Sequence, residues 1–251
     1  MNFSTAHIDW PDAPDAVRLD AQDVHLWAAS LQVAANSLEK LRATLSADEL
    51  ERANRFKFDL HRNCYIAGRG ILRSILARYL ETAANALQFC YSAHQKPELT
   101  PATNPNGLHF NLAHTGDLAL IAVTNTGPLG VDVEEVRVVR DVGDLVARFF
   151  SQRENELFQQ LAPEKKSAAF FSLWTRKEAL LKATGEGITG GLNRVEVSFL
   201  EDEPTRLLAI NGDSEQARPW TLRSFKPLHG FVGALAIKAR SVQVQCWKWA
   251  D

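Results

Sequence analysis

Hydrophobic and polar residues follow two periods along the chain, one helical and one of two residues. Apolar positions that return on one helical face predict three helical segments, the first with a helix start at Ser46 in "SADE": 37–56, 63–80 and 151–184. Short alternating or apolar runs bounded by turn residues predict six strands: 23–31, 118–124, 129–135, 194–200, 220–226 and 230–239. The turn residues "NTGP" predict that the second and third of these strands form a hairpin.

The order of the elements repeats once along the chain. In each half a long helix precedes antiparallel strands, and "LAHTGDLALIAV" in the first half resembles "PLHGFVGALAI" in the second. We therefore expect an α+β fold of two similar α/β halves with a pseudo-twofold relation, each a long helix packed on a small antiparallel sheet. Helix followed by strands is also a common order without any duplication, which remains the alternative. The expected halves are 1–125 and 126–251, with a site in the cleft between them.

Composition narrows the classes of partner. The chain has 251 residues, 45% of them hydrophobic, with a formal charge of −2 and an isoelectric point near 6.4. That balance predicts no nucleic acid or membrane partner, so a polyanion would have to meet a local cluster of cations. The N-terminal sequence has no signal-peptide pattern, and the odd number of cysteines has no metal or disulfide spacing. We expect a cytoplasmic protein.

The strand "GVDVEEV" carries two acids on one face. Because side chains alternate along a strand, Asp132 and Glu134 point the same way, about 7 Å apart, opposite Val131 and Val133. Two carboxylates at that spacing can hold a hard divalent cation such as Mg²⁺ together with phosphate oxygens. The alternative is a strand with a solvated acidic face.

The helical stretch "FFSLWTRKEALLKATGEG" places an acid and a base on one stripe. Trp174, Glu178 and Lys182 follow one another at intervals of four residues. An ordinary exposed Glu–Lys pair is the simplest interpretation. The remaining faces are rich in large apolar side chains, however, so this acid and base are expected to be partly buried and to need partners. A metal ion with a phosphorylated ligand would supply both. The pattern gives no role to the neighbouring Lys177.

The two motifs together resemble a known family. "LGVDVEEV" followed by "FSLWTRKEALLKATGEGI" is similar to the signature of the 4′-phosphopantetheinyl transferases, in particular their surfactin-synthetase-activating (Sfp-type) class. Further similarities are "ERANRFKF" before an arginine-rich helix, the dipeptide Lys96-Pro97, and "FNLAHT" before the first hairpin strand. The resemblance extends over roughly residues 23–190.

The resemblance implies an activity and a set of site residues. It implies Mg²⁺-dependent transfer of the 4′-phosphopantetheine arm of coenzyme A, the co-substrate, to a serine of an acyl or peptidyl carrier protein, with release of 3′,5′-ADP. Glu178 would be the base and Lys182 the partner of the phosphates. The implied metal ligands are Asp132, Glu134 and Glu178, and the implied coenzyme A contacts are Arg52, Arg69, Lys96, Pro97, His114, Thr115, Asp132 and Lys182. The first half would supply coenzyme A-binding elements and the second the metal and the catalytic helix.

The sequence departs from the family pattern at several places, among them His94 and Tyr91, which stand where some relatives have basic residues. Ala113 and Thr115 stand where serines are frequent, and Gln95 replaces the usual glycine before Lys-Pro. Two other functions remain open: a non-catalytic coenzyme A or carrier-binding homologue, and a magnesium-dependent phosphohydrolase. The resemblance further implies a monomer with one site between its halves. Carriers of fatty acid, polyketide and nonribosomal peptide biosynthesis are all compatible with it.

Overall fold

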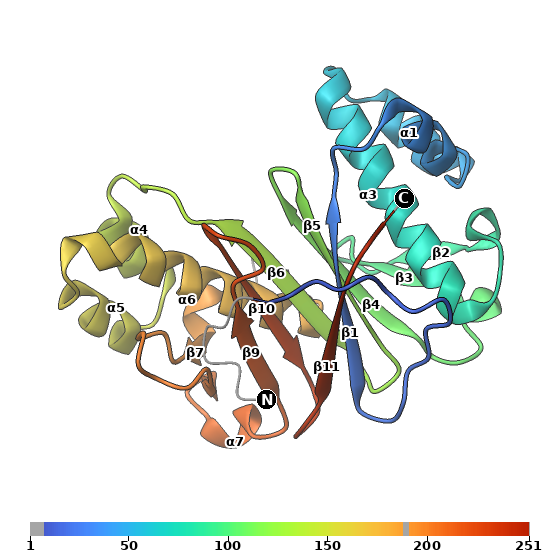
Figure 1. The fold of residues 1–251 in the computed structure, drawn as a ribbon. Helices are drawn as coiled ribbons and strands as arrows, with labels where there is room; N and C mark the ends of the chain where they lie inside the picture. The colour runs from blue at the N-terminus through green and yellow to red at the C-terminus, as the bar shows by residue number, and fades with distance from the viewer. Residues whose placement is uncertain (1–7, 188–190, 251) are drawn as a thin grey trace.

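The computed structural model describes residues 8–187 and 191–250 (Figure 1). The first half contains these helices and strands: β1 (Asp23–Ser30), α1 (Ala35–Arg42), α2 (Ala47–Asn54), α3 (Asp59–Leu80), η1 (Ala84–Ala86), β2 (Phe89–Tyr91), β3 (Pro97–Leu99), η2 (Pro101–Thr103), β4 (His109–Thr115) and β5 (Leu118–Thr124). The second half contains β6 (Leu129–Glu135), α4 (Val142–Phe149), α5 (Gln152–Gln159), α6 (Pro163–Thr184), η4 (Leu192–Arg194), β7 (Val195–Val197), β8 (Leu207–Ile210), α7 (Ser214–Ala217), β9 (Thr221–Phe225), β10 (Phe231–Ile237) and β11 (Gln243–Lys248).

The two halves share one topology, which confirms the expected fold. In the first sheet the strand order is β1-β5-β4, and in the second it is β6-β10-β9. Each half therefore runs strand, long helix, two-stranded ribbon and hairpin, and the long helices α3 and α6 both have 22 residues. Figure 1 shows the two sheets side by side, with one long helix against each. The duplication left open by the sequence thus describes the architecture.

One strand departs from the expected antiparallel sheets. β11, the last strand of the chain, pairs in parallel with β1 and extends the first sheet to four strands, in the order β11-β1-β5-β4. The polypeptide of the second half therefore returns to the first, although the boundary at 125/126 still falls between the sheets. The division into 1–125 and 126–251 stays a prediction.

The predicted hairpin of 118–124 and 129–135 is wrong. β5 pairs with β1 and β4, whereas β6 pairs with β10, so "NTGP" carries the chain from one sheet to the other. The actual hairpin is β4–β5, and it turns at Gly116, whose φ of 53° is left-handed. β6 still contacts β4, because the Val131 amide donates a hydrogen bond of 2.9 Å to the Asn111 side chain. Neighbouring strands thus meet here without forming a ladder.

Two predicted helical segments are each divided in the structure. The segment 37–56 becomes α1 and α2, and the predicted start at Ser46 is confirmed by a capping box with Glu49. The segment 151–184 becomes α5 and α6, because Pro163 occupies the first turn of α6 and starts a new helix.

Three apolar clusters hold these layers together. One lies between α3 and the first sheet, a second between α6 and the second sheet, and a third joins the facing sides of the two sheets. Val131 and Val133 belong to the third cluster, so the opposite face of β6 is turned toward α6. The strand period thereby directs Asp132 to the helix.

A buried ion pair recurs in both halves. Glu49 of α2 accepts from Arg73 of α3 at 2.6 Å, and Glu154 of α5 lies 2.6 Å from Lys177 of α6. Both acids also close the capping box of their own short helix. Each cation lies 14 residues after its long helix begins and donates to two carbonyls beside the following 3-10 helix. These contacts attach a short helix and a loop to each long helix. Lys177 therefore has a structural role.

Replacing Lys177 with methionine should lower the free energy of unfolding by about 3–5 kcal/mol, because Glu154 would remain buried and unpaired. Urea denaturation at constant pH measures this loss. The double variant Glu154→Gln/Lys177→Met should recover part of it, because no net charge stays buried. Lys165→Met, which removes an exposed pair with Glu201, is the matched control and should change stability by less than about 1 kcal/mol. A loss no larger than this control would contradict the assignment.

Candidate active site

The candidate site begins with a close approach of helix and strand. Gly130 lies on β6 directly under α6, and a Cβ built there would be 2.1 Å from the Ala179 carbonyl oxygen and 2.5 Å from the Ala183 nitrogen. Only glycine leaves room for the helix backbone at this point. Asp132, the next residue on the same face, therefore lies under the following turn of α6.

Helical spacing brings a base and an acid of α6 to this strand. Lys182 Nζ lies 2.6 Å from Asp132 Oδ1, in a pair whose aspartate is buried and whose lysine is half-buried. Glu178, one turn earlier, is only 5% exposed. Asp132 Oδ2 and Glu178 Oε1 are both buried and have no hydrogen-bond partner among the described residues. The site therefore contains two buried carboxylate oxygens without a hydrogen-bond partner among the described residues, next to the positive charge of Lys182.

Burial and mutual repulsion shift both carboxyl groups. Burial, together with the charges of Asp132 and Glu134, raises the pKa of Glu178 to about 7, although Lys182 opposes the shift. Burial likewise raises the pKa of Asp132 to about 6, against the attraction of Lys182. A nearby cation would offset both shifts, because positive charge favours the ionised form of a carboxyl group. Ionised carboxylates with vacant oxygens fit a hard cation such as Mg²⁺.

The described residues do not by themselves form a complete metal cage. Among residues 8–187 and 191–250, no group of three or more His, Cys, Asp or Glu side chains is arranged to hold a metal. Glu134, the third predicted ligand, instead accepts a hydrogen bond of 3.3 Å from Thr115 Oγ1 and lies 3.7 Å from Arg137. Its role as a ligand stays a prediction.

The end of β4 adds two of the predicted residues to the same place. Thr115 donates to Glu134 the hydrogen bond described above. The preceding residue, His114, is close enough for the charges of Lys182 and Glu134 to shift its pKa. Partial burial lowers the pKa of His114, Lys182 lowers it further, and Glu134 opposes this. The structure thus gathers residues of β4, β6 and α6, from both halves, around one spot.

Lys96 and Pro97 lie at the junction of the halves. Lys96 Nζ donates to the Lys182 carbonyl at 2.7 Å and to the Leu129 carbonyl at 3.1 Å, and burial lowers its pKa. Both residues line a cavity of about 240 Å³ that also includes the end of α6 at Gly185. The ammonium group therefore joins β3 to α6 and β6, a structural role that the sequence did not indicate.

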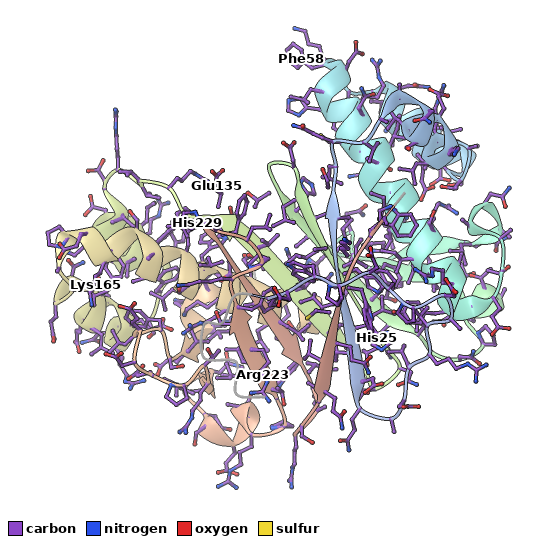
Figure 2. All side chains as sticks on the ribbon, in the orientation of Figure 1. His25, Phe58, Glu135, Lys165, Arg223 and His229 are labelled. Carbon is purple, nitrogen blue, oxygen red and sulfur yellow. The ribbon has the colours of Figure 1, made fainter. Side chains whose placement is uncertain are left out.

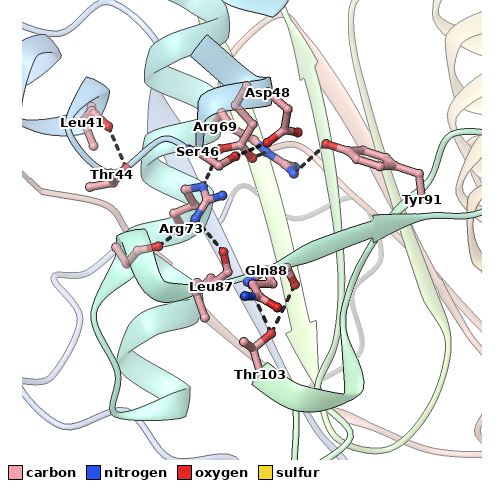
Figure 3. Close-up of polar contacts among 12 residues, drawn as sticks. Leu41, Thr44, Ser46, Asp48, Arg69, Arg73, Leu87, Gln88, Tyr91 and Thr103 are labelled. Atoms are coloured by element: carbon pink, nitrogen blue, oxygen red, sulfur yellow. Dashed lines mark hydrogen bonds and ion pairs between the residues drawn. The ribbon is translucent and has the colours of Figure 1, made fainter. Parts of the chain in front are cut away.

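Arg69 and Arg52 have different surroundings, and Figure 3 shows those of Arg69. Arg69 is buried, donates to Glu49 and, at 3.1 Å, to the Tyr91 hydroxyl, and stacks on the Phe89 ring at 4.0 Å. Arg52 is exposed and lies over the Tyr65 ring at 5.4 Å. No described contact joins either arginine to Asp132 or Glu178, so their binding of coenzyme A stays a prediction. "SADE" indicated only a helix start, and nothing in the sequence revealed Glu49 as the partner of Arg69.

Comparisons with known proteins decide the family. The model of the 4′-phosphopantetheinyl transferase superfamily matches residues 128–237, and the model of the N-terminal region of such transferases matches residues 29–126. The 4′-phosphopantetheinyl transferase HetI of Nostoc sp. is 41% identical over 240 residues, 96% of this chain and 98% of its own. The chain belongs to the 4′-phosphopantetheinyl transferase superfamily.

Other relatives have the same activity in their names. The 4′-phosphopantetheinyl transferase psf-1 of Bacillus pumilus is 31% identical over 169 residues, 67% of this chain and 70% of its own. The transferase Sfp of Bacillus subtilis is 25% identical over 166 residues, 65% of this chain and 70% of its own. The protein is accordingly an enzyme of this transferase class, as the motifs predicted. Among the described residues, no helix has the length and apolar content needed to span a bilayer.

The electrostatics of the metal-free site predict a pH-dependent stability difference. In the folded protein the pKa of Glu178 is about 7, above its ordinary value near 4.5. Protonation of Glu178 therefore stabilises the folded wild type at low pH, and this stabilisation is lost as the pH rises to about 7. Glu178→Gln has no such titration. Its unfolding free energy relative to wild type should therefore increase between pH 5 and pH 8, as measured by urea denaturation with EDTA. A flat or falling difference would contradict the raised pKa.

Proposed function

We propose that the protein transfers the 4′-phosphopantetheine arm of coenzyme A to a serine hydroxyl of a carrier protein and releases 3′,5′-ADP, with Mg²⁺ as cofactor. The observation that carries this proposal is the pair of buried carboxylates, Asp132 and Glu178, each with an unpartnered oxygen, beside the ammonium group of Lys182. Phosphoryl-type transfer needs this combination of a base and of positive charge near the phosphates. Family membership supports the reaction class.

Glu178 would act as the general base. A serine hydroxyl is a weak nucleophile until its proton is taken, and a carboxyl whose pKa is raised to about 7 is both ionised in part at neutral pH and more basic than an exposed glutamate. The serine oxygen forms a bond to the β-phosphorus of coenzyme A, the bond to the bridging oxygen breaks, and the serine proton passes to Glu178. The bridging oxygen leaves with 3′,5′-ADP.

Lys182 and the end of β4 would orient the phosphates. The Lys182 ammonium is half-buried and, within the described part of the chain, bonds to the Asp132 side chain alone, so it can also donate to a phosphate oxygen. His114 with a lowered pKa is largely neutral at pH 7 and offers one N–H donor, and Thr115 offers a hydroxyl. Backbone N–H groups would serve where Ala113 lacks the hydroxyl that relatives provide.

The residues present fit a bound Mg²⁺. Asp132, Glu134 and Glu178 would hold the ion through oxygen atoms, which is the ligand type it prefers. When bound, the ion neutralises charge on the phosphate oxygens. A bound cation would also favour the ionised forms of Asp132 and Glu178.

The adenosine end of coenzyme A would meet residues of the first half. Lys96 and Pro97 line the cavity at the junction, and Arg52 is exposed and available for a phosphate. Arg69 could add to this site only while keeping its pair with Glu49. Coenzyme A would then extend from the first half to the α6–β6 site.

The partners and setting follow from the same reaction. The substrates would be coenzyme A and an acyl or peptidyl carrier, in fatty acid, polyketide or nonribosomal peptide biosynthesis. Since both halves lie in one chain, we propose a monomer. The described cysteines Cys64, Cys90 and Cys246 are all free thiols, which fits a cytoplasmic location.

Replacing Glu178 with glutamine should reduce transfer at least about 100-fold, because Gln cannot take the serine proton. Mass spectrometry of a panel of apo carrier domains, after incubation with coenzyme A and Mg²⁺, measures the added phosphopantetheine and identifies the preferred carriers. Glu135→Gln, which changes an exposed acid at the end of β6, is the control variant and should keep activity near wild type. Activity near wild type in Glu178→Gln would rule out its role as base. Release of 3′,5′-ADP without a carrier would indicate a phosphohydrolase instead.

Adding Mg²⁺ should raise the melting temperature of the wild type in the absence of any substrate, because the ion binds the folded state alone. Asp132→Asn should remove most of this rise, since it deletes one of the two buried carboxylates. Differential scanning calorimetry with and without EDTA measures both. An equal rise in the two proteins would place the ion elsewhere.

A further inference from the structure

A second cationic site lies on the outer part of the second half. Four arginines line one cavity of about 310 Å³ between the edge strand β9 and the β8–α7 segment: Arg206, Arg218, Arg223 and Arg240. No aspartate or glutamate lines it, although the whole chain carries a net charge of −2. Like charges gathered around one hollow repel one another unless an anion lies between them.

Arg223 is the member of this group that most needs a partner. It lies within β9, where its Nε is buried and has no hydrogen-bond partner among the described residues. A buried donor without an acceptor costs stability, most of all when it belongs to a charged group. Figure 2 shows Arg223 near α7, at the end of the molecule opposite to Glu135 and His229. None of the residues that line the cavity belongs to the candidate active site, so the two are separate.

The other lining groups indicate what kind of anion would fit. Arg218 already pairs with Glu215 at 2.8 Å, and both side chains are largely exposed, so a ligand can compete for it. Arg206 and Arg240 are exposed and form no ion pair within the described residues. Hydroxyls of Thr205 and Ser214 also line the cavity, together with the indole of Trp220.

We propose that this cavity binds a small phosphorylated anion. Guanidinium groups bind phosphate through paired, charge-assisted hydrogen bonds, and several can share one pyrophosphate. The cavity volume is at the lower end of the range for small-molecule sites, which suits a pyrophosphate or a nucleotide rather than a macromolecule. A nucleotide would in addition place its base on Trp220.

Isothermal titration calorimetry of the full chain with inorganic pyrophosphate, in EDTA and low salt, tests the proposal. Arg223→Gln should weaken binding at least about tenfold, the loss expected for a hydrogen bond to a charged group. Arg206→Gln/Arg240→Gln should do the same. These two side chains are exposed, so the second variant keeps the test valid if the first destabilises β9.

Two control variants locate the bound anion. Arg153→Gln removes an exposed arginine of α5 outside the cavity and should leave the affinity within about twofold. Lys182→Met removes a cation of the candidate active site, so it should abolish only pyrophosphate bound there and leave the binding that the cavity variants lose. Loss of binding in Lys182→Met but not in the cavity variants would overturn the proposal, as would the absence of any binding to the wild type.

A second titration with ADP separates the two sources of the phosphate. Binding of ADP at least about tenfold tighter than pyrophosphate, lost in Trp220→Ala, would support a nucleotide ligand. Equal affinities, unchanged in Trp220→Ala, would support an anion recognised by its phosphates alone. Failure of both ligands to bind would contradict the site without affecting the transferase reaction, which is measured on carrier proteins.

Discussion

The close contact of α6 with β6 at Gly130 is the constraint on which the site depends. Because this position has no side chain, the helix packs directly on the strand. Glu178 and Lys182 of α6 therefore lie close to Asp132 of β6. Two carboxyl groups are thereby removed from water with a single lysine to balance them. This geometry, more than either motif alone, creates the raised pKa values and the vacant oxygens that a transferase of this kind can use.

The pseudo-twofold arrangement explains why the site occurs once. Glu49 with Arg73 and Glu154 with Lys177 fix the long helices in the same way, so the scaffold is duplicated. The residue after Lys177 is Glu178, whereas the residue after Arg73 is Ser74, and Arg78, at the position of Lys182, stacks over Trp27 at 5.1 Å. The first half thus kept the helix packing and has an aromatic contact where the second half has charges.

Local patterns were readable from the sequence, whereas pairing across the fold was not. The helix start at Ser46 and the face of β6 that carries Asp132 each depend on neighbouring residues, and the structure has both. The predicted hairpin of 118–124 and 129–135 was wrong because "NTGP" is compatible with any turn and does not specify which strands pair. The partner of β6 is β10, about a hundred residues further along the chain. The surroundings of Arg69 could not be read from the sequence for a similar reason: an arginine-rich helix is visible there, but the acid that pairs with Arg69 lies on another helix. Capping residues are local signals, and ion pairs between helices are not.

A fully paired buried charge stands next to an incompletely paired one on α6. Lys177 is satisfied by Glu154 and two carbonyl groups, while the adjacent Glu178 has a free oxygen. The Lys177 contacts, made to α5, η4 and β7, anchor α6 beside the point where Glu178 and Asp132 repel each other. Replacing Lys177 should therefore make the position of Glu178 less fixed. The stability of one ion pair is what permits its neighbour to remain available for a cation and a substrate.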